Sequence, residues 1–141
     1  MVKLVENAAS YVDEEVYRYI NFEFKQLRKY EQHLEEISRA EELSRTSERF
    51  TRKMTAPEIN MRKDMHWKME NLYKAFDDAV EIAPADRREQ LRNRVRARLV
   101  YNETPLFFER EDKLLEECVM RARLLGLAYL QPQIRHKIID E

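Results

Sequence analysis

One uninterrupted run of periodic apolar residues near the start of the chain constrains the fold most. Between Val16 and Ile37, apolar side chains recur at steps of three or four residues, the spacing of one face of an α-helix. No glycine or proline precedes Pro57, and the whole chain has one glycine and four prolines. Because these residues punctuate strands and turns, we predict an all-α protein that begins with a long helix. The stripe consists of Val16, Ile20, Phe24, Leu27, Tyr30, Leu34 and Ile37.

A helix with such a stripe must pack on the rest of the chain or on another protein, because it cannot cover the stripe alone. Tyr17, Tyr19 and Phe22 extend aromatic surface beyond the stripe, which favours a second contact. The residues leave both alternatives open. Ser10 is the predicted N-cap of this helix, and the polar residues 41–55 are predicted to form a connector.

Helix signals continue through the rest of the chain. Thr55 and Glu58 have the spacing of a capping box, and Pro57 is tolerated in a first turn. In the last long helix, Thr104 is the predicted N-cap, and Phe107 and Phe108 open its apolar pattern. Gly126 indicates an end or a kink. The predicted helices span about 55–84, 84–102 and 104–125, and a short tail ends the chain.

Six arginines within residues 87–98 frame an apolar strip formed by Leu91, Val95 and Leu99. Arginines in this position can remain solvated over the edge of a core, or they can bind carboxylates or phosphates of an acidic partner. Six arginines within twelve residues favour binding to an acidic partner. One flank of the strip carries Arg88, Arg92 and Arg96, and the other carries Arg87, Arg94 and Arg98.

Composition excludes several classes of protein. A net charge of −1 at pH 7 disfavours a chain that coats nucleic acid. The only cysteine, Cys118, excludes an internal disulfide and is expected to be a small buried hydrophobe. No apolar run approaches the ~20 residues that span a bilayer, and the acidic first residues indicate no ordinary signal or transit peptide.

The sequence offers no catalytic constellation, so we predict a protein that is not an enzyme. His33, His66 and His136 are far apart, and none has a metal ligand at Glu-x-x-His spacing. There is no glycine-rich phosphate loop. Asp77 and Asp78 are adjacent, so on a helix they point about 100° apart.

Three blocks of sequence over residues 58–126 resemble the LYR-motif family. Leu72-Tyr73-Lys74 stands in the place of the signature tripeptide, followed by Ala75-Phe76. About two dozen residues later, the run from Val95 to Asn102 resembles the second block of the family, and Leu114 to Glu117 resembles the third. Lys74 replaces the usual arginine, Leu99 replaces a typical phenylalanine, and Cys118 replaces a frequent glycine. Asp77 and Asp78 occupy a turn that is often basic.

The resemblance implies a small mitochondrial three-helix protein at the matrix side of the inner membrane. Family members serve as accessory subunits or assembly factors of respiratory and related complexes. Many bind the mitochondrial acyl carrier protein, whose acylated phosphopantetheine enters the bundle. The signature region most resembles the LYR accessory subunit of respiratory complex I. We therefore expect a non-catalytic accessory subunit of a respiratory-chain or ATP synthase complex, with no cofactor of its own and no nucleic-acid partner.

The resemblance also assigns the regions and residues. Residues 1–55 would be an N-terminal helical arm with its connector, residues 56–130 the LYR-type three-helix bundle, and residues 131–141 a C-terminal tail. The expected contacts with the carrier protein are Tyr73, Lys74, Arg88, Arg92, Arg94, Arg96 and Arg98. The expected core around the acyl chain comprises Met65, Met69, Leu72, Phe76, Leu91, Val95, Leu99, Leu115 and Val119.

Two other functions remain as alternatives. One is an assembly factor for a respiratory complex or for Fe–S cluster machinery, which would bind its complex only transiently. The other is a stand-alone helical bundle that binds an apolar ligand. The N-terminal arm is expected to fasten the bundle to a large assembly.

Overall fold

A computed structural model of the protein describes residues 1–46 and 55–141. It confirms an all-α protein, with short 3₁₀ turns between helices and one pair of two-residue strands in the described part of the chain. The elements are β1 (Lys3–Leu4), α1 (Glu14–Thr46), α2 (Ala56–Ala79), α3 (Arg88–Val100), α4 (Lys113–Leu130), α5 (Arg135–Ile138) and β2 (Ile139–Asp140).

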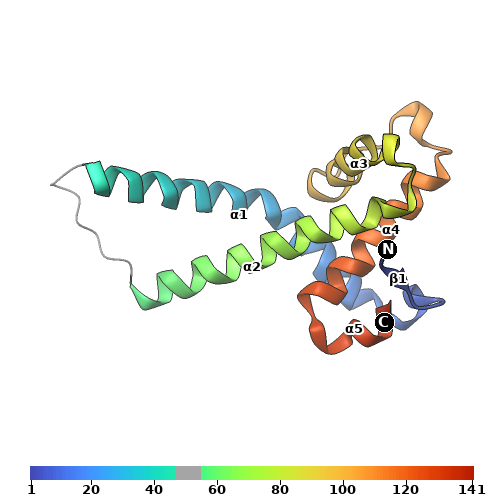
Figure 1. The fold of residues 1–141 in the computed structure, drawn as a ribbon, viewed down its shortest axis with the longest axis horizontal. Helices are drawn as coiled ribbons and strands as arrows, with labels where there is room; N and C mark the ends of the chain where they lie inside the picture. The colour runs from blue at the N-terminus through green and yellow to red at the C-terminus, as the bar shows by residue number, and fades with distance from the viewer. Residues whose placement is uncertain (47–54) are drawn as a thin grey trace.

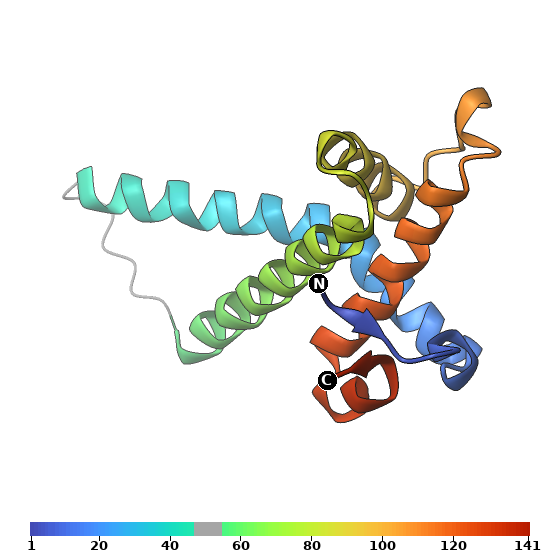
Figure 2. The same ribbon diagram turned by 45° about the vertical axis from the view of Figure 1, so that its right-hand side comes forward.

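The helices are arranged as a body with a projecting helical hairpin. Figures 1 and 2 show α3, α4, α5 and both chain termini gathered in the body, while the C-terminal part of α1 and the N-terminal part of α2 extend away from it. The ion pair between Arg62 and Glu41 joins the two helices of the hairpin. Within the body, α2 packs most extensively on α4.

The first half of α1 belongs to the core of the body. Ile20, Phe24 and Leu27 are fully buried, in the same apolar cluster as the buried residues of α2, α3 and α4. The rings of Phe24 and Phe76 lie with centroids 5.2 Å apart. Of the two alternatives for the apolar stripe, this half of the helix therefore packs on the rest of the chain.

Gly126 permits the close approach of α1 and α4. A Cβ atom at this position would lie 2.9 Å from Cδ1 of Ile20 and 3.1 Å from Cζ of Phe24. Gly126 is therefore not the end or kink that its residue type suggested, since it lies buried inside α4, which continues to Leu130.

The start of α4 also differs from the prediction. The helix begins at Lys113, where the side chain of Asp112 accepts a hydrogen bond from the Leu115 N–H, and not at Thr104. Residues 102–106 form no helix, and 107–109 form a single 3₁₀ turn. Asn102 has φ = 51°, a left-handed conformation that ends the preceding helical segment, and Asp112 provides the N-cap in place of Thr104.

Of the other predicted helix ends, the one at Thr55 agrees with the structure and the one at Ser10 does not. The capping box of Thr55 and Glu58 is present, as predicted. Ser10 lies in a 3₁₀ turn, and Asp13 accepts the hydrogen bond from Val16 N–H at the start of α1. The predicted connector over 41–55 is helical as far as Thr46, and residues 47–54 lie outside the described part.

A buried arginine of α4 joins the end of α2 to the N-terminal residues. Arg121, only 6% exposed, donates hydrogen bonds to the carbonyls of Asp78, Ala79 and Val2. Carbonyls at a helix C-terminus have no partner within the helix, so Arg121 supplies one. The tail docks nearby, because β2 pairs with β1 and Ile138 is fully buried.

Among residues 1–46 and 55–141, none of the helices combines the length and the apolar character needed to cross a membrane.

Candidate docking surface

The arginines of α3 lie on two flanks, as the helical spacing predicted. Arg92 and Arg96 face α2 and α1, while Arg94 and Arg98 face the segment that leads into α4 and α4 itself. Leu91, Val95 and Leu99 lie between the flanks and are buried. The predicted strip and its two cationic borders are thus brought together by α3.

On the flank that faces α1 and α2, the arginines bind carboxylates of the same chain. Nε of Arg92 lies 2.5 Å from Oδ1 of Asp77, and Nη2 of Arg96 lies 2.5 Å from Oε1 of Glu31. Tyr73 donates its hydroxyl to Glu31 at 2.8 Å. Burial and this hydrogen bond raise the pKa of Tyr73 to about 12. Tyr73 is therefore a link between α2 and α1, held as a hydrogen-bond donor.

On the other flank, the arginines fix the segment before α4. Arg94 binds Glu109 at 2.5 Å and Glu103 at 3.2 Å, and Arg98 binds Glu116 at 2.7 Å. Glu109 is 3% exposed. Burial alone would raise its pKa, but hydrogen bonds from Arg94 and from the Leu106 N–H outweigh burial and hold the pKa below its usual value.

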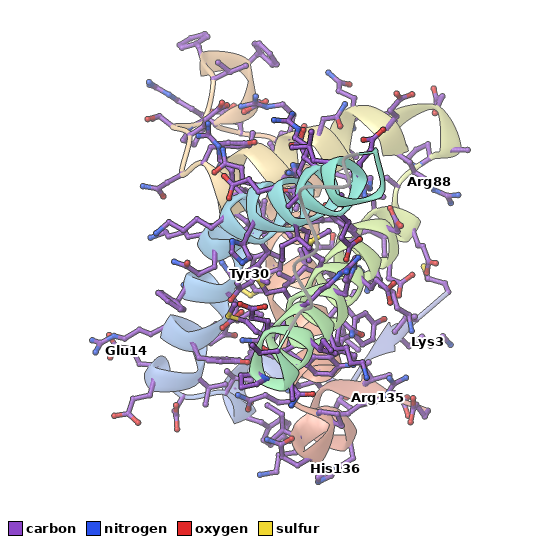
Figure 3. All side chains as sticks on the ribbon, turned by 90° about the vertical axis from the view of Figure 1, so that its left-hand side faces the viewer. Lys3, Glu14, Tyr30, Arg88, Arg135 and His136 are labelled. Atoms are coloured by element: carbon purple, nitrogen blue, oxygen red, sulfur yellow. The ribbon has the colours of Figure 1, made fainter. Side chains whose placement is uncertain are left out.

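Two of the seven expected contact residues keep a charge that no carboxylate in the described part of the chain neutralises. Lys74 is exposed, with Nζ 4.6 Å from the ring centroid of Tyr129. Arg88, labelled at the edge of the molecule in Figure 3, donates to the carbonyls of Glu81 and Ala83. Both cations lie around the C-terminal half of α2, and they are the predicted residues best placed to meet an acidic group.

The acidic pair Asp77 and Asp78 has partners within the protein. Asp77 binds Arg92, and Asp78 accepts the Tyr129 hydroxyl at 2.5 Å. Burial and this bond raise the pKa of Tyr129 above its usual value, so the hydroxyl stays protonated. The two carboxylates therefore oppose an acidic partner less than their sequence position suggested.

The nine residues expected around an acyl chain are part of the packed interior. Met65, at 7% exposure, is buried farther along the hairpin than the main cluster, and Met69 is partly buried at the edge of that cluster. The other seven are buried members of it: Leu72, Phe76, Leu91, Val95, Leu99, Leu115 and Val119. Within the described residues, one surface depression lies around residues 110–113 and another around residues 1–4, and none of the nine lines either one.

Cys118 is a fully buried thiol, as its place on an apolar face predicted. Burial raises its pKa. A reactive thiolate requires a lowered pKa, so this shift disfavours a reactive cysteine. In the described residues, no group of three histidine, cysteine, aspartate or glutamate side chains is placed to hold a metal ion.

Sequence reasoning placed two phenylalanines in a helix core that the structure leaves at the surface. Phe107 is 85% exposed and Phe108 is 72% exposed, on the 3₁₀ turn that Glu109 anchors. The signal that could have corrected this was Asp112, a good N-cap immediately before the next apolar periodicity.

Comparison of the chain with protein-family models, with curated proteins and with solved structures gave no match.

Proposed function

We propose that the protein is a non-catalytic accessory subunit of a mitochondrial respiratory-chain or ATP synthase complex, and that it docks an acyl carrier protein through α2 and α3. The observation that supports this proposal most is that two cations near residues 72–74 are not neutralised. Lys74 and Arg88 carry charges without a carboxylate partner in the described residues, beside a helix whose Leu72 is anchored in the core.

The carrier would contribute carboxylates and a phosphate to this contact. A carboxylate or phosphate can be bound by the ammonium of Lys74 as a point charge and by the guanidinium of Arg88 with two parallel hydrogen bonds. The sequence predicted that four more arginines contact the carrier, but in this proposal they act differently: Arg92, Arg94, Arg96 and Arg98. Since each binds a carboxylate of its own chain, their first role is to hold α3 against its neighbours.

In this proposal the acyl chain enters at the end of the core near Met65 and Met69. Methionine side chains are unbranched and adapt to a flexible guest. Each CH₂ that leaves water contributes about 0.8 kcal/mol, before the costs of ordering are subtracted. The acyl chain would separate α1 from α2 at the base of the hairpin, where Met69 is only partly buried.

Co-expression with a mitochondrial acyl carrier protein tests the proposal. We expect the two proteins to co-elute in gel filtration, and intact-mass measurement to show the acylated carrier. The double variant Lys74→Glu/Arg88→Glu should lose the carrier. The matched control Lys63→Glu/Lys137→Glu has the same change in charge on exposed lysines and should keep it. Separate elution of the wild-type proteins would refute carrier docking.

A further inference from the structure

The exposed side of α1 carries a short block of basic residues that no part of the carrier contact uses. Between Val16 and Tyr30 the only acidic residue is Glu23, which is 4% exposed. Glu23 binds Lys68 at 3.4 Å and accepts the Tyr30 hydroxyl at 2.9 Å, so its charge is directed inwards. The outer surface of this block therefore presents cations without acidic neighbours in the same stretch of helix.

Three of these cations form no ion pair within the described residues. They are Lys25, Arg28 and Lys29, and all three are exposed. Arg28 lies over the ring of the exposed Tyr101, with Cζ 5.8 Å from the centroid, and keeps its charge. The arginines of α3 differ, since most of them are neutralised by carboxylates of the chain. The block on α1 is thus the larger unneutralised cationic surface.

An apolar side chain lies in the middle of the block. Phe22 is 56% exposed and shares a helix face with Lys25 and Lys29, because residues three and seven positions apart on a helix lie on one side. A large exposed aromatic among cations is typical of a contact surface, where the aromatic supplies burial and the charges supply orientation. We define the cationic ridge as Arg18, Phe22, Lys25, Arg28 and Lys29.

Acidic residues close the ridge at both ends. Glu14 and Glu15 precede it, with Glu14 bound to Arg18 at 3.0 Å, and Glu35 and Glu36 follow it. In Figure 3, Glu14 points outwards at the edge of the molecule opposite Lys3. From residue 18 to residue 29 a helix rises only ~17 Å. An extended polyanion that followed α1 beyond this length would meet negative charge at either end.

We propose that the cationic ridge binds a short acidic segment of a partner protein, in which two or three carboxylates flank an apolar side chain that covers Phe22. Charge complementarity selects carboxylates for Lys25, Arg28 and Lys29, and the acidic ends limit the footprint to about the length of one short helix. Nucleic acid and anionic membranes extend past those ends, and they fit the ridge less well. The ridge is a second contact, separate in sequence from Lys74 and Arg88.

Photo-crosslinking from Phe22 tests the ridge directly. The full chain would carry p-benzoylphenylalanine at position 22 in its native cells, and the crosslinked segment would be sequenced. We expect one protein, joined through a segment rich in aspartate and glutamate. The variant Lys25→Glu/Lys29→Glu should lower the crosslink yield at least tenfold, while the control Lys63→Glu/Lys137→Glu should leave the yield unchanged.

Several results would overturn the proposal: a crosslink to nucleic acid or lipid, a protein segment without an excess of carboxylates, equal yields in the two charge variants, or no crosslink. Thermal melts of every variant would establish that each is folded. Retention of the acyl carrier by Lys25→Glu/Lys29→Glu in gel filtration would separate a failure of the ridge from a failure of carrier docking.

Discussion

The two halves of α1 have the same apolar periodicity and different surroundings. In the first half, Ile20, Phe24 and Leu27 are fully buried in the core cluster formed with α2, α3 and α4. In the second half, Leu34 is 7% exposed and Ile37 is only partly buried, along the hairpin that extends from the body. Periodicity therefore identifies which face of a helix is apolar, while the number of neighbouring helices decides how far that face is buried.

The largest expected difference is in the loss of stability when Leu27 or Leu34 is replaced by alanine. These two residues lie one heptad apart on the same stripe. Leu27→Ala should lower the free energy of unfolding by about 2–5 kcal/mol, because it leaves a cavity in the packed core. Leu34→Ala should cost less, since the hairpin can close around a smaller side chain. Urea denaturation of both variants measures the difference, and equal costs would erase the distinction between the two halves.

The next largest effect concerns the close contact between the first half of α1 and α4 at Gly126. Gly126→Val places a branched side chain where a single Cβ would already lie 2.9 Å from Ile20. We expect a loss of about 1–3 kcal/mol from overpacking, larger than the gain from removing a glycine in a helix. Thermal unfolding measures it. Restoration of stability by the second substitution Ile20→Ala would confirm the steric cause, and an unchanged melting temperature for Gly126→Val would contradict it.

A smaller loss of stability is expected where the two halves of α1 meet. There the Tyr30 hydroxyl donates a hydrogen bond to the buried Glu23 carboxylate. Tyr30→Phe should cost about 1 kcal/mol. Burial and the bond to Glu23 raise the pKa of Tyr30 from 10.0 to about 12. A raised pKa stabilises the folded protein below pH 10, and this contribution is lost as the pH rises towards 12.

The difference in stability between wild type and Tyr30→Phe should therefore be constant up to about pH 10 and shrink above it. Denaturation curves at pH 8 and pH 11 measure the change. A difference that grows between these two values would show that the hydrogen bond is not the origin of the effect.

The smallest effect belongs to the second half of α1. Arg39 and Glu35 form an exposed pair four residues apart, at 2.5 Å. Arg39→Ala should change stability by less than about 0.5 kcal/mol, because exposed pairs on a helix contribute little. A melting temperature that falls by many degrees would mean that this part of the hairpin carries more of the stability than its burial indicates.

Local signals in the sequence predicted much of this fold, and contacts distant in sequence explain the rest. The cap at Thr55 and the two flanks of α3 depend on neighbours within a few residues, and both were predicted correctly. The role of Gly126 depends on Ile20, more than a hundred residues away, so its residue type alone indicated an end or a kink. Spacing within α4 cannot reveal which helix approaches it.

The candidate site shows the same limit. Helical spacing located the arginines, but it could not show that Glu31, Glu109 and Glu116 bind three of them. These carboxylates come from α1, from the segment before α4 and from α4, so only the folded chain shows which cations remain for a partner. Carrier docking and residence in a mitochondrial complex remain predictions.

Carrier docking in a mitochondrial complex is best tested by native affinity purification of the full chain from mitochondria, followed by mass spectrometry and intact-mass detection of the carrier. We predict recovery of a respiratory-chain or ATP synthase complex together with an acylated carrier protein, and loss of the carrier with Lys74→Glu/Arg88→Glu. Recovery of the chain as a lone monomer would contradict it.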